Sequence, residues 1–489
     1  MNQELQATET TETQNLAREA FLHEPLGRLI VKNAMPAVAS MLFVAFYQIV
    51  DGMMVGRRLG PEALASINIL YPIFALLAGV GIMIGVGGNA RIAVLLGAGD
   101  QRKASSVLGL IVSIGAVVGI VTSAVTMMLM PHILRFFGTS GGQLGAFAGS
   151  YLKGLLPFFV FMLLTFILEQ SVRNDGSPNL AGGVMAGCAL LNILLDYLFL
   201  FVFDFGIAGA AVASGISQSI GAIIFLGYFI RKSLKKTPGL IFAKPVLNGR
   251  IVQSIAVNGS SEMLNSLAAG FTTFLFNRMI LSHVGALGVA AFTLVQYLLM
   301  VGMFIIMGIG NGSQPIFSYN HGAGLKHRVK GALWRVSAAC TLVGAALFLL
   351  ITWQTEAAAA LFLPGQPEAL QLTLEVAGFV RWSILFMPLA MLGSIYFTAL
   401  EQAAKSLVVA LSRGLILPVA GLAVFPGWWG SAGIWVTPAF AEGVTVLVVM
   451  GCLFWKKEER NIPEANALQE ECQVIVWDLP GINKKPVNT

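Results

Sequence analysis

Two aspartates, Asp51 and Asp196, lie inside apolar stretches that are long enough to cross a bilayer. An ionisable side chain in hydrocarbon costs several kcal/mol, so it normally has a partner or a function. Two carboxylates in an apolar environment repel each other and are poorly solvated, and both effects favour retention of a proton. The pair could therefore share a proton and release it when water enters. The carboxylates could instead bind Na⁺, and the side chains alone leave both ions open.

The two aspartates are expected at a similar depth in the membrane. Asp51 lies six residues before Arg57, where its apolar stretch ends, which is about 9 Å along a helix. Asp196 lies eight residues before Asp204, which is about 12 Å. Both distances are counted from the same membrane face, so they predict one layer that contains both carboxyl groups.

Four further polar residues are expected near this layer. Ser214 and Asn68 enter their own apolar stretches from the same side and reach a similar depth. Asn192 and Tyr47 each precede one of the two aspartates by one helical turn, and residues four apart share a helix face. Amide and hydroxyl oxygens beside two carboxylates form an all-oxygen site of the kind that hard cations such as Na⁺ prefer.

Other interpretations of these residues stay open. Asp51 could cap a broken helix, or it could pair with Arg57 or Arg278. Pro36 lies fifteen residues before Asp51, and a proline inside a helix removes one backbone hydrogen bond and kinks the helix. Pro36 could therefore be a hinge that lets the helix bend, or it could occupy the first turn, where proline is tolerated.

The composition indicates an integral membrane protein. Of the 489 residues, 56% are hydrophobic and 11% are charged, whereas a soluble protein carries about 25% charged residues. The net charge of +6 comes from basic residues in short loops, where they act as topology signals and do not indicate nucleic-acid binding. The four cysteines indicate neither a disulfide framework nor a metal site. No Walker motif is present, so we expect neither an ATP-hydrolysing enzyme nor a cofactor.

Twelve apolar spans are predicted, which gives an all-α integral membrane fold. Their approximate ranges are 33–56, 64–90, 104–130, 151–172, 180–203, 206–230, 254–281, 287–318, 332–354, 378–400, 406–426 and 431–455. Lysine and arginine concentrate in alternate loops, so the positive-inside rule places both termini in the cytoplasm. The even number of spans agrees with that orientation. We expect a multi-pass protein of the bacterial inner (cytoplasmic) membrane.

The chain repeats itself after a shift of 225 residues. Gly97-Ala98-Gly99 then falls on Gly322-Ala323-Gly324, and Asn33 falls on Asn258. Each repeat has an even number of spans, so the two halves share one orientation and are related by an axis along the membrane normal. Two pseudo-symmetric six-helix bundles that rock against each other would give alternating access.

The repeat also exposes a difference between the halves. Asp51 of the first half aligns with Phe276 of the second, so the acidic chemistry of the first helix is not duplicated. In the second half, Arg413 and Glu442 lie in the last two spans and could pair with each other.

The predicted organisation is two lobes with polar ends. We expect a disordered cytoplasmic tail, an N-lobe with the first six spans, a cytoplasmic linker, a C-lobe with the last six spans, and a second cytoplasmic tail. Their ranges are 1–25, 26–232, 233–250, 251–455 and 456–489.

Several motifs resemble the multidrug and toxic compound extrusion (MATE) family. They are Tyr47-Gln48-Ile49-Val50-Asp51-Gly52, Leu59-Gly60-Pro61-Glu62-Ala63, Arg173-Asn174-Asp175-Gly176-Ser177-Pro178 and Leu191-Asn192-Ile193-Leu194-Leu195-Asp196, followed by the glycine- and alanine-rich stretch that ends at Ser214. The resemblance covers residues 25–455. It implies a MATE-like fold with two six-helix lobes.

The resemblance also implies a cation-coupling site in the N-lobe. The family's site residues match Asp51, Asn192, Asp196 and Ser214, and relatives often carry threonine in place of the serine. The proline of the family's first helix matches Pro36, which we place with Tyr47 and Asn68 as gating or second-rank residues.

A second cation site, in the C-lobe of some family members, is doubtful here. Those members carry a glutamate deep in helix 7 and an aspartate in helix 10. Here helix 7 has only Glu262, near its expected cytoplasmic start. Glu262 is either a second-rank coupling or gating residue or a solvated carboxylate that the helix dipole favours.

The resemblance implies antiport, with export of small amphipathic, often cationic organic compounds in exchange for H⁺ or Na⁺. The alternative is a flippase for a lipid-linked saccharide, from the same superfamily. That anionic substrate should favour several basic residues in the cleft, and few intramembrane basic residues are present. A third possibility is a membrane scaffold or channel without transport activity. The buried acid pair and the duplicated fold favour this possibility least. The expected partners are a small organic substrate and the lipid bilayer, without nucleic acid, and we expect a monomer.

Overall fold

The structure is a computed structural model that describes residues 18–136, 142–235, 237, 239–245, 248–362 and 367–455. Every regular element within these ranges is a helix. This confirms the all-α fold that the long apolar stretches predict.

The N-lobe contains the first six predicted spans. They are α2 (Leu26–Leu59), α3 (Pro61–Gly97), α4 (Gln101–Phe136), α5 (Gly142–Leu155) with a 3₁₀ turn (Leu156–Phe158) and α6 (Phe159–Asn174), α7 (Pro178–Tyr197) with a π-helical turn (Leu198–Val202), and α8 (Gly206–Lys235). The fourth span is therefore built from two helices that the 3₁₀ turn joins.

The C-lobe contains the other six. They are α9 (Gly249–His283), α10 (Ala286–Gly322), α11 (Lys326–Phe362), α12 (Pro367–Val380) with α13 (Ser383–Ala399), α14 (Ala403–Leu411) with a π-helical turn (Ser412–Ile416) and α15 (Leu417–Trp429), and α16 (Ser431–Phe454). The fifth segment of each lobe contains a π-helical turn, and the sixth segment of each lobe is a single helix, α8 or α16.

Most of these segments are long and apolar enough to cross a membrane. Ten helices of the described part meet that description, and the bent pair α12–α13 makes eleven. The remaining segment, α9, has 35 residues and is less apolar than the others. It is about 50 Å long at the usual helical rise, more than a bilayer needs. The twelve-helix prediction is consistent with this arrangement.

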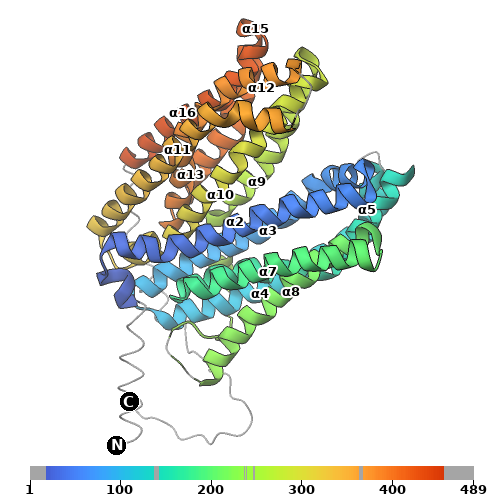
Figure 1. Cartoon of the computed structure of the whole chain (residues 1–489). Coiled ribbons are helices and arrows are strands. Elements are labelled where there is room, and N and C mark those ends of the chain that lie inside the picture. The colour runs from blue at the N-terminus through green and yellow to red at the C-terminus, as the bar shows by residue number, and fades with distance from the viewer. Residues whose placement is uncertain are drawn as a thin grey trace, which may run out of the picture.

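The two lobes meet at the end of the molecule where α2 begins and α16 ends, which we call the basal end. From there the helices of the two lobes diverge toward the opposite, distal end (Figure 1). The main contacts between the lobes pair α3 with α9 and α2 with α10. The 225-residue shift relates α2 to α9 and α3 to α10, so these two pairings are equivalent in the repeat. The lobes are therefore closed against each other at the base.

Repeated glycines allow this close approach. A Cβ atom added to Gly97 on α3 would lie 2.1 Å from the carbonyl oxygen of Tyr319 on α10. A Cβ atom added to Gly322 on α10 would lie 2.0 Å from the carbonyl oxygen of Val94 on α3. These four residues are related by the 225-residue shift, so the same contact is made twice. Small residues at such crossings let two helix backbones approach closely.

The last part of the expected N-terminal tail is ordered, because residues 18–23 are helical. The ring of Phe21 stacks on Tyr319 of the C-lobe with 4.4 Å between ring centroids. The guanidinium of Arg18 donates to the last carbonyl of α3 in the N-lobe, and Arg328 of α11 donates to the carbonyl of Phe21. This segment therefore contacts both lobes at the base.

The linker between the lobes also packs on the N-lobe. It begins after Lys235, where α8 ends. The carboxylate of Asp175 accepts hydrogen bonds from the backbone N–H of Leu240 at 2.7 Å and from the hydroxyl of Tyr228 at 2.5 Å. The side chain of Leu240 is fully buried. The linker is thus held as a strap under the N-lobe.

Candidate functional site

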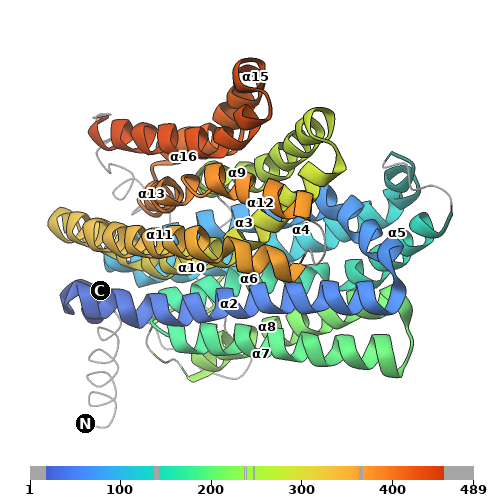
Figure 2. The same cartoon turned by 45° about the horizontal axis from the view of Figure 1, so that its top comes forward.

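The two aspartates that the sequence placed in one layer lie together in the N-lobe. Helices α2 and α7 pack side by side along the lobe (Figure 2). The carboxyl groups of Asp51 on α2 and Asp196 on α7 lie close enough to interact with each other. A hydrogen bond between two carboxyl groups requires one of them to carry a proton. The geometry therefore suits a pair that shares a proton.

The polar neighbours of Asp196 come from α7 and α8. Asp196 is fully buried, and Asn192 lies one turn before it on the same face of α7. With its amide oriented to satisfy both partners, Asn192 donates to Asp196 Oδ2 at 3.2 Å and accepts from Ser214 Oγ at 3.1 Å. The amide thus links the acid to the hydroxyl, and all four residues that the MATE resemblance indicates form one cluster.

Each carboxyl group of the pair leaves one buried oxygen without a partner. Oδ1 of Asp51 and Oδ1 of Asp196 accept no hydrogen bond. No ion pair of the described residues joins Asp51 to Arg57 or Arg278. Asp51 also lies well inside α2, which continues to Leu59, so it does not cap a helix break. Both structural alternatives for Asp51 are therefore wrong, and two oxygens stay available for a proton or a cation.

A cavity of about 280 Å³ opens beside the pair, inside the N-lobe. Tyr47, Asp51, Asn192 and Ser214 all line it. Its other walls are largely apolar and include the side chains of Phe74, Leu155, Phe159, Met162 and Met185. Ligand pockets commonly combine an apolar wall with a few polar groups. This cavity has that character next to the acid pair.

Some lining residues were not found from the sequence. Tyr151 of α5 and Gln218 of α8 both face the cavity. Gln218 lies one turn beyond Ser214 on the same helix, so helical spacing could have found it. Tyr151 could not be found this way, because the sequence does not fix how α5 is rotated against α2.

Pro36 lies inside α2, eleven residues into the helix as it begins at Leu26, so its placement in a first turn is wrong. The hydroxyl of Ser40 donates to the Pro36 carbonyl at 2.6 Å. On α7, Gly182 lets the two helices approach, because an added Cβ there would lie 2.8 Å from the same carbonyl oxygen. A proline at this position interrupts the ladder of backbone hydrogen bonds below the acid pair.

Asn68 lies on α3, but its side chain falls outside the described part of the structure. Its expected place near the acid pair stays a prediction.

Glu262 differs from its expected position near a solvated helix start. It lies more than three turns into α9, which begins at Gly249. Its Oε1 accepts a hydrogen bond from Ser394 Oγ of α13 at 2.9 Å. The interpretation of Glu262 as a solvated carboxylate at a helix start is therefore wrong. The span predicted from the sequence began at residue 254, later than α9 does, and so placed Glu262 too near the start of the helix.

The predicted pairing of Arg413 with Glu442 is confirmed. The guanidinium Nε of Arg413 donates to both carboxylate oxygens of Glu442, at 2.9 and 3.0 Å. The two side chains are mostly buried. These two charges of the C-lobe thus neutralise each other.

Among the residues that the structure describes, no group of three or more histidine, cysteine, aspartate or glutamate side chains could hold a metal ion. The cluster of two carboxyls, one amide and one hydroxyl is suited to a proton or to one hard monovalent cation. Its two unpartnered carboxyl oxygens are the ligand atoms that either ion would need.

A model of the MatE family matches residues 36–198 and 263–421, which is more than half of the chain. Multidrug export protein MepA of Staphylococcus saprophyticus is 27% identical over 437 residues, which cover 89% of this chain and 95% of that protein. MepA of Staphylococcus aureus is 26% identical over 450 residues, which cover 92% and 98% of the two chains.

Solved structures share the fold. A crystal structure of MATE in complex with MaL6 superposes with a TM-score of 0.83 at 21% identity, and the match covers 88% of this chain and 96% of that one. The outward-facing conformation of a multidrug resistance MATE family transporter of the MOP superfamily gives a TM-score of 0.83 at 21% identity, covering 91% and 97%. The resemblance read from the motifs is confirmed.

Proposed function

Because the chain belongs to the MatE family, we propose that it is a secondary active antiporter that exports small amphipathic, often cationic organic compounds in exchange for H⁺ or Na⁺. It is a multi-pass membrane protein, and we place it in the bacterial inner membrane as a monomer with both termini in the cytoplasm. The names of its relatives, which are multidrug export proteins, support export.

The observation that carries the coupling proposal is the pair of unpartnered carboxyl oxygens on Asp51 and Asp196. A buried polar atom without a partner is costly, so such atoms persist where a ligand satisfies them. A proton bound by the pair, or Na⁺ held with the oxygens of Asn192 and Ser214, would satisfy them. A cationic solute in the adjacent cavity would compete with that ion for the same negative charge.

The coupling step follows from this competition. A ligand shifts a conformational equilibrium only through its different affinity for the two states. Ion binding at Asp51 and Asp196 removes negative charge between α2 and α7, so it changes how these helices pack. Pro36 lies on α2 between the acid pair and the basal contacts, where it can act as the hinge. Glu262 is a second-rank candidate for gating on the C-lobe side.

No observation favours the flippase alternative. Arg173, a buried basic group that lines a pocket between the lobes, is paired with Glu169 and so offers little net positive charge to an anionic substrate. We therefore propose that the substrates are organic solutes and not lipid-linked saccharides. We also propose that the protein has no enzymatic activity and no cofactor.

Transport of ethidium into inside-out membrane vesicles tests the proposal. Vesicles that contain the protein are given ethidium and then a proton gradient or a sodium gradient, one at a time. We expect one of the two gradients to drive ethidium accumulation above that of vesicles without the protein. Accumulation that neither gradient changes would refute antiport, and the gradient that works identifies the coupling ion.

A further inference from the structure

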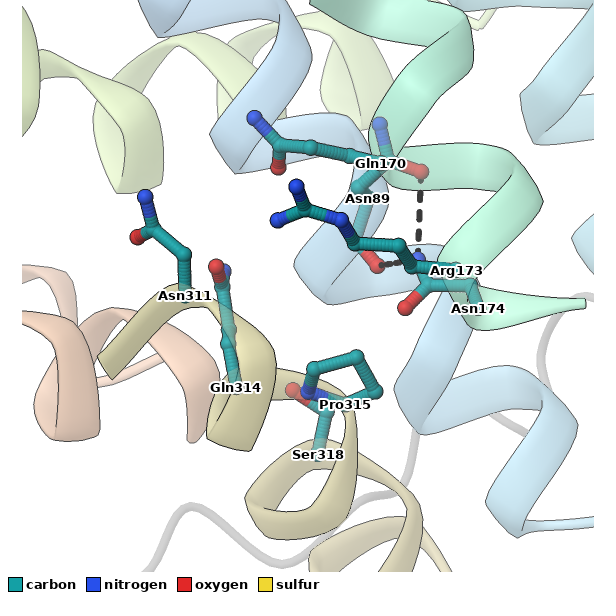
Figure 3. A pocket seen from close by; sticks show the side chains of 8 residues that line it. All are labelled: Asn89, Gln170, Arg173, Asn174, Asn311, Gln314, Pro315 and Ser318. Atoms are coloured by element: carbon teal, nitrogen blue, oxygen red, sulfur yellow. Dashed lines mark hydrogen bonds between the residues drawn. The ribbon is translucent and has the colours of Figure 1, made fainter. Parts of the chain in front are cut away.

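A second polar pocket lies where the two lobes meet at the base, away from the acid pair. Eight residues line it, from α3 and α6 of the N-lobe and from α10 of the C-lobe. Its volume of about 10 Å³ is at the lower limit for a single water molecule. Figure 3 shows polar side chains of the two lobes reaching toward each other across it.

Some of the polar residues around this pocket are occupied with holding the helices together. The amide of Asn89 donates to the carbonyls of Gly85 and Ile167, and its oxygen accepts from Ser171 and Asn174. These bonds hold α3 against α6 and occupy both the donor and the acceptor groups of the Asn89 amide. Ser318 on α10 is likewise bound to a carbonyl of α13.

Four other polar side chains around the pocket have hydrogen-bonding groups to spare. Gln170 of α6 and Asn311 and Gln314 of α10 make no side-chain hydrogen bond within the described part of the chain. Arg173 of α6 is 3% exposed, and its Nε–H is buried without an acceptor. Two lobes thus contribute two unused polar groups each to one pocket. Buried polar groups are normally satisfied, so the unpartnered Nε–H of Arg173 indicates a ligand, and the three free amides line the same pocket.

The unused groups define the chemistry of that ligand. The Arg173 Nε–H can only donate, so the ligand must offer an acceptor atom there. Each free amide can both donate and accept, which suits a carbonyl or carboxamide group. The carboxylate of Glu169 is already paired with Arg173, so the pocket carries no spare negative charge for a cation. Its character is therefore opposite to that of the acid pair.

The position of the pocket explains why it is small in this conformation. Each lobe supplies half of the unused groups, so the pocket widens only when the lobes separate at the base. Contacts beside it cross the same junction, since the hydroxyl of Tyr319 donates to the Asn174 carbonyl at 2.6 Å and Arg91 pairs with Glu401 at 2.9 Å. Opening the base would break these contacts and expose the unused groups to an entering solute.

We propose that Gln170, Arg173, Asn311 and Gln314 form a recognition site for a carbonyl or carboxamide group of the exported solute, with a water molecule in its place when the base is closed. The inference rests on the proposed export of amphipathic cations and adds to it the polar half of the substrate. The acid pair attracts the positive charge, and the basal pocket selects solutes that also carry a hydrogen-bond acceptor.

Two matched phosphonium cations test this site. Butyltriphenylphosphonium and the same cation with a terminal carboxamide on its chain are compared as inhibitors of gradient-driven ethidium accumulation in inside-out vesicles. We expect the carboxamide compound to inhibit at about fivefold lower concentration, because one neutral hydrogen bond contributes about 1 kcal/mol. In Gln170→Met and Gln314→Met, which keep side-chain length but cannot form the bond, this preference should fall to about one.

The matched control is Gln253→Met, at an exposed position on α9, which should keep the fivefold preference. Equal inhibition by the two phosphoniums in the unmodified protein, or a preference that both pocket variants retain, would overturn the inference. Ethidium efflux that neither phosphonium inhibits would also overturn it while leaving antiport intact. Failure of ethidium efflux in the unmodified protein would instead refute the proposed function. Binding of both phosphoniums to the purified variants, followed by tryptophan fluorescence, gives the same ratio without transport.

Discussion

The two lobes share one fold but differ where the first helix of each approaches the distal end. In the N-lobe this position is Asp51, which lies close to Asp196 beside a cavity. In the C-lobe the aligned residue is Phe276, whose ring stacks on Phe292 with 5.4 Å between centroids. Phe292 in turn stacks on the fully buried Trp435. One lobe keeps an acid pair beside a cavity at the point that the other fills with aromatic rings.

This difference indicates that the two lobes of a duplicated fold can take different roles. The C-lobe neutralises Arg413 with Glu442 and gives Glu262 a hydroxyl donor from Ser394. The N-lobe leaves carboxyl oxygens unpartnered. Satisfied charges stabilise one arrangement, whereas unsatisfied ones make the arrangement depend on what binds. We therefore expect ion-dependent movement to begin in the N-lobe, at the acid pair.

The largest effect is expected from removing one charge of the acid pair. Asp51→Asn and Asp196→Asn should each lower gradient-driven ethidium efflux by about 100-fold, since loss of one charged ligand from a buried site costs about 3 kcal/mol or more. Asp204→Asn is the matched control. Asp204 is exposed and forms only a surface pair with Arg58, so its loss should change efflux by less than about twofold. An Asp51→Asn protein that transports like the unmodified one would place coupling elsewhere.

An intermediate effect, on stability, is expected from introducing an acid into the C-lobe. Phe276→Asp should lower the free energy of unfolding by about 3 kcal/mol or more, because it opens a cavity in an aromatic stack and buries a carboxyl there. Phe276→Leu should cost only about 1–2 kcal/mol. Thermal unfolding in detergent measures both changes as a lowered Tm. Equal Tm values for the two variants would mean that the C-lobe tolerates an acid as the N-lobe does.

The smallest effect is expected at Ser214. Ser214→Ala removes the hydroxyl that Asn192 accepts from, but the backbone N–H of residue 214 still donates to the same amide oxygen at 3.2 Å. We expect about a threefold loss of efflux, in keeping with one neutral hydrogen bond. Ser214→Thr keeps the hydroxyl and should stay within about twofold of the unmodified protein. A threonine variant as impaired as the alanine one would show that volume, and not the hydroxyl, matters here.

Much of the N-lobe site could be predicted from the sequence because helices obey simple geometry. Counting residues from the helix ends placed Asp51 and Asp196 at one depth, and the four-residue spacing placed Asn192 below Asp196. The structure brings these side chains together. Depth and helix face were sufficient here because α2 and α7 pack against each other along the lobe.

Other features depend on how helices rotate and pack, which the sequence does not state. Glu262 was placed too near a helix end, because polar residues before it concealed the true start of α9 at Gly249. The basal pocket joins α6 to α10, which are 145 residues apart at the contact between Asn174 and Tyr319. No local pattern predicts that Gln170 and Gln314 face each other. The docking of Phe21 on Tyr319 was missed because the apolar residues that precede α2 are few.

The doubled contact of Gly97 with Tyr319 and of Gly322 with Val94 has a consequence for the origin of the chain. Two identical six-helix proteins related by a two-fold axis would make this contact twice without any change. Joining two such genes end to end would therefore have required a connecting loop and no new surface. Once both copies were on one chain, a mutation could alter one without the other, and an aspartate on one side could coexist with a phenylalanine on the other.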